Sequence, residues 1–178
     1  PQRVWNNMTQ YLLAAIPLFI FMASMLEKSG VIEEVFDVAY KWLGRIPGGL
    51  AVATVVASTV LAAMVGVIGA AVVTMALVAL PSMLRRGYSP VLAVGTVMAG
   101  GTLGILIPPS VLAIVYGLVA NQSVGELYLG SVFPGLVLSG LYILFSVGYA
   151  LLNPKAAPRL SPEETPTWSE RWRALRSI

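Results

Sequence analysis

The sequence contains no cysteine and no histidine among its 178 residues. Without cysteine the chain has no disulfide and no thiol nucleophile, and without histidine it has neither an imidazole base nor an imidazole metal ligand. Charged residues make up only 11% of the chain, whereas an ordinary soluble domain carries about 25%. The chain therefore has few groups for covalent or metal chemistry and little charge for a soluble surface.

What the sequence does contain is hydrophobic residues, which make up 57% of it, and its mean hydropathy is +0.82. These values indicate an all-α integral membrane protein, with the lipid bilayer as a partner. The net charge of +3 does not indicate nucleic-acid binding, because the basic residues stand at the ends of apolar runs and form no patch interleaved with aromatics. Membrane topology explains these basic residues better.

Four uncharged stretches divide the chain. The first and last suit single spans of about 20 residues, but the second has 39 residues, far too many for one crossing of a core roughly 30 Å thick. That stretch must enter the membrane and return. The stretches are Val4–Leu26, Ile46–Leu84, Gly87–Gly125 and Leu127–Pro154.

The positions of the basic residues predict a topology. Basic side chains favour the cytoplasmic face, and one arrangement places ten of the eleven there. Both ends of Ile46–Leu84 are then inside, and Asn121–Glu126 is outside. The ten residues are Lys28, Lys41, Arg45, Arg85, Arg86, Lys155, Arg159, Arg171, Arg173 and Arg176.

Two segments are expected at the membrane surface. Residues 27–45 show an apolar stripe at helical spacing, which predicts an interfacial connector, so residues 1–45 comprise one span and this helix. Residues 154–178 begin as a proline-rich linker. The capping-box pattern Thr167–Glu170 then predicts the start of an amphipathic arm helix.

The first residues, Pro1–Arg3, show no initiator methionine or signal-peptide pattern, and we expect the chain to be a piece of a longer polypeptide.

Residues 46–86 are predicted to form a re-entrant helical hairpin that turns at Gly66–Gly69. Two full spans would have only about 18 residues each and an apolar turn in water, whereas a tip buried in protein avoids that conflict. Gly66 and Gly69 allow a turn and a close approach of backbones. Tight helix packing through small residues remains an equal alternative for either glycine taken singly.

Residues 87–126 are predicted to form a broken transmembrane helix, followed by a span over residues 127–153. Pro108 and Pro109 remove two backbone donors and push Ile107 out of the α region. Broken helices at the midplane expose carbonyls that bind Na⁺ or helix ends that bind anions. The alternative is a proline kink satisfied by neighbouring helices. No acid, base or nucleophile constellation is present in the apolar stretches, so we do not expect an enzyme.

Three motifs resemble the large membrane subunit of tripartite ATP-independent periplasmic (TRAP) transporters, the DctM-like permease. They are Gly48–Thr54 (GGLAVAT), Ala79–Tyr88 (ALPSMLRRGY) and, most specifically, Gly101–Ser110 (GTLGILIPPS). The resemblance covers most of the chain. It implies most of the first half of an inverted-repeat, elevator-type transporter in the bacterial inner membrane.

By this resemblance the full subunit imports organic acids with Na⁺ as the coupling ion and has no other cofactor. It works with a small membrane subunit and a periplasmic substrate-binding protein. Many relatives have a Ser-Ser pair at the hairpin tip where this chain has Val67–Ala70, so backbone carbonyls must contribute more. The implied site residues are Gly66, Val67, Gly69, Ala70, Thr74, Gly101, Thr102, Gly104, Pro108, Pro109 and Ser110, with Na⁺ near Gly66, Gly69, Thr102 and Ser110.

A membrane scaffold or interaction subunit that transports nothing is the alternative function. A scaffold needs no broken helix, however, so Pro108-Pro109 with its flanking glycines favours transport.

Overall fold

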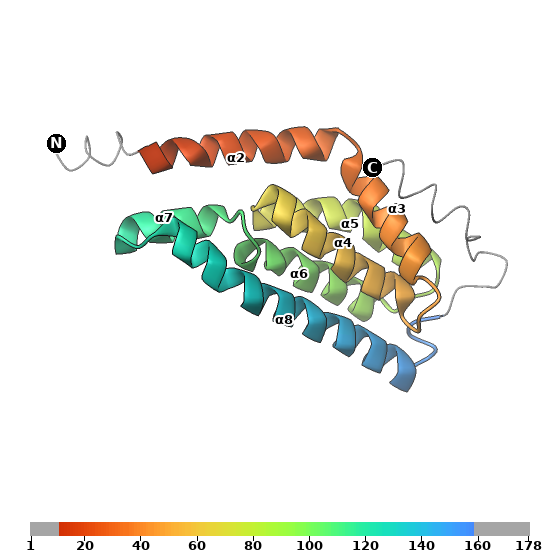
Figure 1. Ribbon diagram of the computed structural model, residues 1–178. Helices are drawn as coiled ribbons and strands as arrows, with labels where there is room; N and C mark the ends of the chain where they lie inside the picture. Colours follow the sequence, from red (N-terminus) through yellow and green to blue (C-terminus); the bar gives the residue numbers. More distant parts are fainter. Residues whose placement is uncertain (1–10, 159–178) are drawn as a thin grey trace.

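The computed structural model describes residues 11–158, and over this range the chain is helical with no strand (Figure 1). This confirms the predicted all-α class. The helices are α2 (Tyr11–Lys28), α3 (Val31–Leu43), α4 (Gly49–Val65), α5 (Ile68–Arg85), α6 (Pro90–Leu106), α7 (Val111–Ala120) and α8 (Val124–Leu152).

Helices α2 and α3 meet at a sharp corner of 62°, where Gly30 adopts a left-handed conformation with φ 79°. The apolar stripe predicted within residues 27–45 lies on α3 and packs onto the helical core through buried Ile32, Phe36 and Ala39. Glu33 stays exposed on the opposite face, as the helical period requires.

Helices α4 and α5 form the predicted hairpin, and α6 packs against both of them. Most residues of α4 are buried, because α3, α5, α6 and α8 surround it (Figure 1). This explains why the sequence of α4 is apolar on every side and shows no amphipathic period. The turn is made by Gly66, whose φ of 64° suits glycine, and by extended Val67.

The third apolar stretch is broken as the prolines predict. Helix α6 ends at Leu106, α7 begins at Val111, and their axes differ by 42°. Ser110 caps α7, since its Oγ accepts a hydrogen bond from the Ala113 amide at 3.4 Å. The Pro108–Pro109 peptide bond is cis.

Helix α8 lies along α4 and fixes the depth of the break. The Oγ1 of Thr59 and the Oγ of Ser139 are 2.7 Å apart, and Ile107 lies against Gly135. At about 1.5 Å per residue, Gly135 is roughly 17 Å from the start of α8 and roughly 26 Å from its end. Figure 1 agrees, because α7 and the first turns of α8 extend beyond the turn between α4 and α5. The break therefore lies inside the bundle.

Two of the described helices, α5 and α8, are long and apolar enough to cross a membrane. The number rises to four if the bent pairs α2–α3 and α6–α7 each count as one span. Length alone does not distinguish a crossing from an arm of a hairpin. The α4–α5 turn lies beside the interior of α8. This position favours α5 as one arm of a re-entrant hairpin over α5 as a full crossing.

Five of the six described basic residues stand in the last turn of α3 or just at or beyond the ends of α3, α5 and α8, which lie at the same end of the bundle (Figure 1), and the sixth, Lys28, ends α2. Arg86 lies over the Tyr40 ring, 4.4 Å from its centroid, and donates to the Tyr40 hydroxyl. The Ser89 amide donates to the Ala156 carbonyl at 2.9 Å, next to Lys155. This clustering is the arrangement that the one-sided charge distribution requires.

Tyr88 anchors the hairpin at the same end. Its hydroxyl accepts a hydrogen bond from the Leu50 amide at 3.3 Å, one of the donors that α4 cannot satisfy internally. Burial raises the pKa of Tyr88, although the Leu50 hydrogen bond and the charge of Arg86 act in the opposite direction. The phenol therefore stays neutral and its polar atom remains paired.

The arm helix predicted to begin at Thr167–Glu170 and the first residues of the predicted span over Val4–Leu26 lie outside the described residues. The domain boundaries at residues 45, 86, 126 and 153 stay predictions.

Candidate ion and substrate site

The hairpin turn and the helix break meet inside the bundle. The Val111 amide, at the start of α7, donates a hydrogen bond to the Gly66 carbonyl at 3.3 Å. Gly66 packs so closely that a Cβ built on it would overlap the carbonyl oxygen of Pro109. The structure thus brings together Gly66, Pro109 and Ser110, three of the site residues expected from the sequence.

Four helix ends converge at this point. The C-terminus of α4 faces the N-terminus of α7 through the bond between Gly66 and Val111. The C-terminus of α6 faces the N-terminus of α5, since the Cβ position of Gly104 is 3.8 Å from the Ile68 amide nitrogen and from the Val67 carbonyl carbon. Each pair places the negative end of one helix dipole beside the positive end of another.

Three backbone carbonyls at the helix break accept no hydrogen bond from the described residues. The Ile107 amide donates to the Leu103 carbonyl at 2.9 Å, which closes the last turn of α6. No hydrogen bond from residues 11–158 reaches the carbonyl oxygens of Ile107, Pro108 or Pro109. Hard cations prefer oxygen ligands of this kind.

The N-terminus of α5 is open. Its cap residue, Val67, has no side-chain oxygen to accept from the first amides, and no atom of another described segment lies within 4 Å of a Cβ built at Gly69. Ala70 is half-buried beside it. The close backbone approach expected of Gly69 is therefore absent from the described part of the chain. Free amides at a helix start suit an anion such as a carboxylate.

Two hydroxyls expected at the site point elsewhere. Thr102 is exposed, its Oγ1 donates to the Ala99 carbonyl at 2.7 Å, and the same atom lies 3.4 Å from the Tyr142 hydroxyl on α8. Thr74 is buried, and its Oγ1 donates to Glu27 Oε1 on α2 at 3.2 Å. Ser110 is the expected hydroxyl residue that lies at the meeting point.

The glycine pair in α6 serves packing. A Cβ on Gly100 would lie 2.5 Å from the Oγ of Ser58 on α4, and a Cβ on Gly101 would overlap the side chain of Val72 on α5. Both glycines thus allow α6 to pack closely against the two hairpin arms, α4 and α5. Gly101 was expected at the binding site, and its contact with Val72 gives it a packing role on the α5 side of α6.

Tyr128 on α8 is a site residue that the sequence analysis missed. Its hydroxyl donates to the Ser110 carbonyl at 3.2 Å. The sequence offers no signal for it, because a tyrosine in an apolar stretch resembles any other aromatic of a span.

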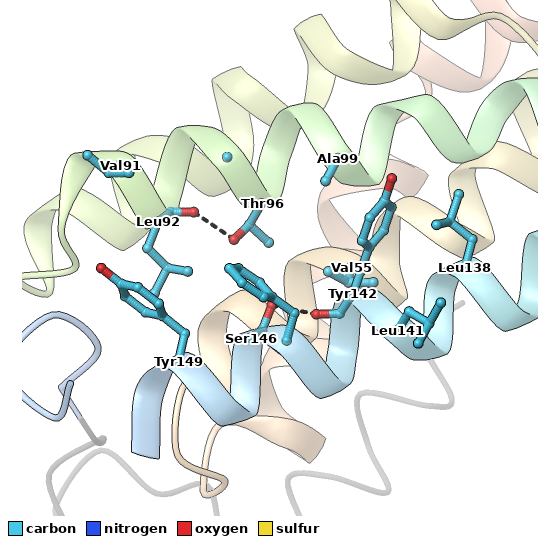
Figure 2. Close-up of a pocket in the computed structure, with 12 residues that line it drawn as sticks. Val55, Val91, Leu92, Thr96, Ala99, Leu138, Leu141, Tyr142, Ser146 and Tyr149 are labelled. Carbon is cyan, nitrogen blue, oxygen red and sulfur yellow. Dashed lines mark hydrogen bonds between the residues drawn. The ribbon is translucent and has the colours of Figure 1, made fainter. Parts of the chain in front are cut away.

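A cavity of about 600 Å³ lies between α6 and α8 (Figure 2), and none of Gly66, Pro109 and Ser110 lines it. Its two buried hydroxyls bond back to their own helices: Thr96 to the Leu92 carbonyl at 2.6 Å and Ser146 to the Tyr142 carbonyl at 2.8 Å. The remaining lining is mostly hydrocarbon, so this cavity offers little to an ion or an organic acid. The site is better placed at the meeting of the helix ends.

Comparison with known proteins decides the family. The family described as tripartite ATP-independent periplasmic transporter, DctM component, matches residues 1–177. This chain belongs to the DctM family. The resemblance inferred from the three motifs is confirmed, and so is the expectation that the chain is part of a transport permease and not an enzyme. With its apolar helices, this DctM-family chain is a multi-pass membrane protein.

Curated relatives carry different substrate names. The chain is 40% identical to the C4-dicarboxylate TRAP transporter large permease protein DctM of Vibrio cholerae, over 84% of this chain and 32% of the relative. It is 31% identical to the ectoine permease TeaC of Halomonas elongata, over 92% and 37%. It is 32% identical to the isethionate permease protein DctMQ of Oleidesulfovibrio alaskensis, over 84% and 24%. The chain thus spans about a third of the length of these relatives or less.

Proposed function

We propose that this DctM-family chain is most of the first inverted repeat of a permease that imports small organic acids together with Na⁺. The observation that carries the proposal is the contact of Gly66 with Pro109 and Val111, which joins a hairpin turn to a helix break inside an apolar bundle. Backbone of this kind is tolerated at membrane depth only where protein or a ligand satisfies it.

Na⁺ is proposed to bind at the carbonyl side of the site. The free carbonyls of Ile107, Pro108 and Pro109 lie just after the C-terminus of α6, where the helix dipole favours a cation. The Oγ of Ser110 is a further oxygen ligand. The hydroxyl of Thr102 is not assigned to this shell, because it faces Tyr142.

The organic acid is proposed to bind at the open N-terminus of α5. The amides that follow Val67 have no side-chain cap and are accessible at Gly69. A carboxylate there would lie within the same group of helix ends as the cation, so each charge would stabilise the other. The relatives named for C4-dicarboxylate, ectoine and isethionate differ in substrate, so we propose a small organic acid and no particular compound.

Family membership supports a proposal for the wider assembly. We propose that the permease lies in a bacterial inner membrane and receives its substrate from a periplasmic binding protein. It would work with a small membrane subunit, and a second, inverted repeat would complete an elevator-type transporter. The identity and coverage of the relatives support this assignment.

The re-entrant hairpin makes a topology prediction. In a full-length permease without other cysteines, Lys28→Cys, Arg85→Cys and Lys155→Cys should each react with an impermeant thiol reagent only from the cytoplasmic side. Gln122→Cys should react only from outside. All four side chains are exposed, so access to solvent does not limit labelling. Labelling of Lys28→Cys and Arg85→Cys from opposite faces would show that the hairpin crosses the membrane.

The transport proposal is tested with the assembled transporter in liposomes. Uptake of a radioactive organic acid is measured with an inward Na⁺ gradient and again with choline replacing Na⁺, with no proton gradient in either case. We expect uptake to fall to background in choline, because the break then lacks its cation. Equal uptake in the two media would refute Na⁺ coupling.

A further inference from the structure

Tyr128 connects α8 to the core of the site. Its hydroxyl donates to the Ser110 carbonyl at 3.2 Å, and the Ile114 amide donates to the same carbonyl at 3.3 Å. Ser110 is only 1% exposed, so this carbonyl depends on protein donors and not on water. Ser110 directly follows Pro109, whose own carbonyl packs onto Gly66.

The corner between α7 and α8 holds Tyr128 in place. Asn121 ends α7 in a left-handed conformation with φ 52°, and the Gln122 amide donates to the Gly117 carbonyl at 2.9 Å. A Cβ on Gly117 would lie 2.8 Å from a side-chain carbon of Val124, so the two helices approach closely here. The corner is therefore tightly packed, and it fixes the first turn of α8 against α7.

We propose that Tyr128 is a positioning residue that sets the affinity of the site for Na⁺. By fixing the Ser110 carbonyl, its hydroxyl holds the end of the break, and with it the Pro109 carbonyl, at the correct distance from the hairpin turn. Tyr128 does not touch the ion. The inference rests on the proposed Na⁺ site and extends it to a residue outside the three sequence motifs.

The variant Tyr128→Phe removes only the hydroxyl and keeps the ring. The Ser110 carbonyl then keeps one donor, from Ile114, and gains freedom to turn. We expect the Na⁺ concentration for half-maximal uptake to rise roughly three- to tenfold, as loss of one buried hydrogen bond implies, while the maximal rate stays within about twofold.

The matched control is Tyr116→Phe. Tyr116 lies on α7, is 58% exposed, and its hydroxyl makes no hydrogen bond within residues 11–158. The substitution again removes only a phenol hydroxyl, but this hydroxyl makes no contact with the helix break. The Na⁺ concentration for half-maximal uptake should therefore equal that of the unaltered protein. Both variants are compared in the assembled transporter in liposomes, with the amount of inserted protein measured for each.

The outcomes separate this inference from the proposed function. A raised half-saturating Na⁺ concentration in Tyr128→Phe alone supports it. An unchanged value overturns it, even if the unaltered protein requires Na⁺. A fall in maximal rate or inserted protein with unchanged Na⁺ dependence also overturns it, because Tyr128 would then act only in folding. If the unaltered protein takes up substrate without Na⁺, the proposed function and this inference both fail.

Discussion

Replacing Gly66 with alanine is expected to reduce uptake at least roughly tenfold while the permease still inserts into the membrane. Gly66 has φ 64°, a conformation that costs a residue with a Cβ about 1–2 kcal/mol. The new methyl group would also overlap the Pro109 carbonyl oxygen, so the turn and the break would have to move apart. The measurement is the initial rate of uptake by the assembled transporter, divided by the amount of inserted protein.

Gly69→Ala is the matched control for this prediction. It adds the same methyl group three residues later, in the first turn of α5, but no atom of another described segment lies within 4 Å of its Cβ position. Because Gly69 lies at the proposed carboxylate end of the site, the two variants are compared at saturating substrate, where we expect Gly69→Ala to retain most of the maximal rate of uptake. If the two variants behave alike, whether both active or both inactive, then the contact between Gly66 and Pro109 does not explain the requirement for glycine.

The double substitution Pro108→Ala and Pro109→Ala is expected to have the second large effect. A proline inside a helix costs about 3 kcal/mol relative to alanine, so removing both eliminates the main obstacle to a continuous helix from α6 into α7. The carbonyls that are free in the break would then accept helical hydrogen bonds. Uptake and its dependence on Na⁺ should both be lost, with insertion retained.

The control for the double substitution is Pro90→Ala. Pro90 is the first residue of α6 and is exposed, a position where the missing amide donor costs the helix nothing. This variant should transport normally. Retention of Na⁺-dependent uptake by the double variant would mean that the break is only a packing kink.

Local chemistry explains which features the sequence could predict. The break at 107–110 follows from two missing amide donors, and the burial of Ile32 and Phe36 follows from the period of α3. The turn at Gly66 follows from its uncharged, glycine-containing setting in a run too long for one crossing. Each of these depends on residues close together in the chain.

The remaining features depend on contacts between distant segments. Gly66 and Gly69 have similar apolar neighbours in the sequence, so the sequence does not distinguish them. In the structure, Gly66 packs against Pro109 of another segment, and Gly69 makes no such contact with the described residues. The hydroxyl of Thr102 turns to Ala99 and Tyr142, because its face of α6 lies toward α8 and not toward the hairpin turn. Such orientations are set by how helices pack, which no short pattern encodes.

Tyr128 shows the same limit for an aromatic residue. Its spacing from the proline pair carries no information, because its contact with Ser110 depends on the angle at which α8 leaves the corner after Asn121. Tyr116 has a similar sequence setting and lies exposed. Only the three-dimensional arrangement separates the two.

We propose above all that Na⁺ binds where the hairpin turn meets the helix break. The most direct test of this proposal is equilibrium binding of radioactive Na⁺ to the purified full-length permease in detergent, without substrate or partner subunits. We expect saturable binding by the unaltered protein and by Gly69→Ala, and none by Gly66→Ala or by the double proline variant. Saturable Na⁺ binding of equal affinity in all four proteins would contradict the proposal.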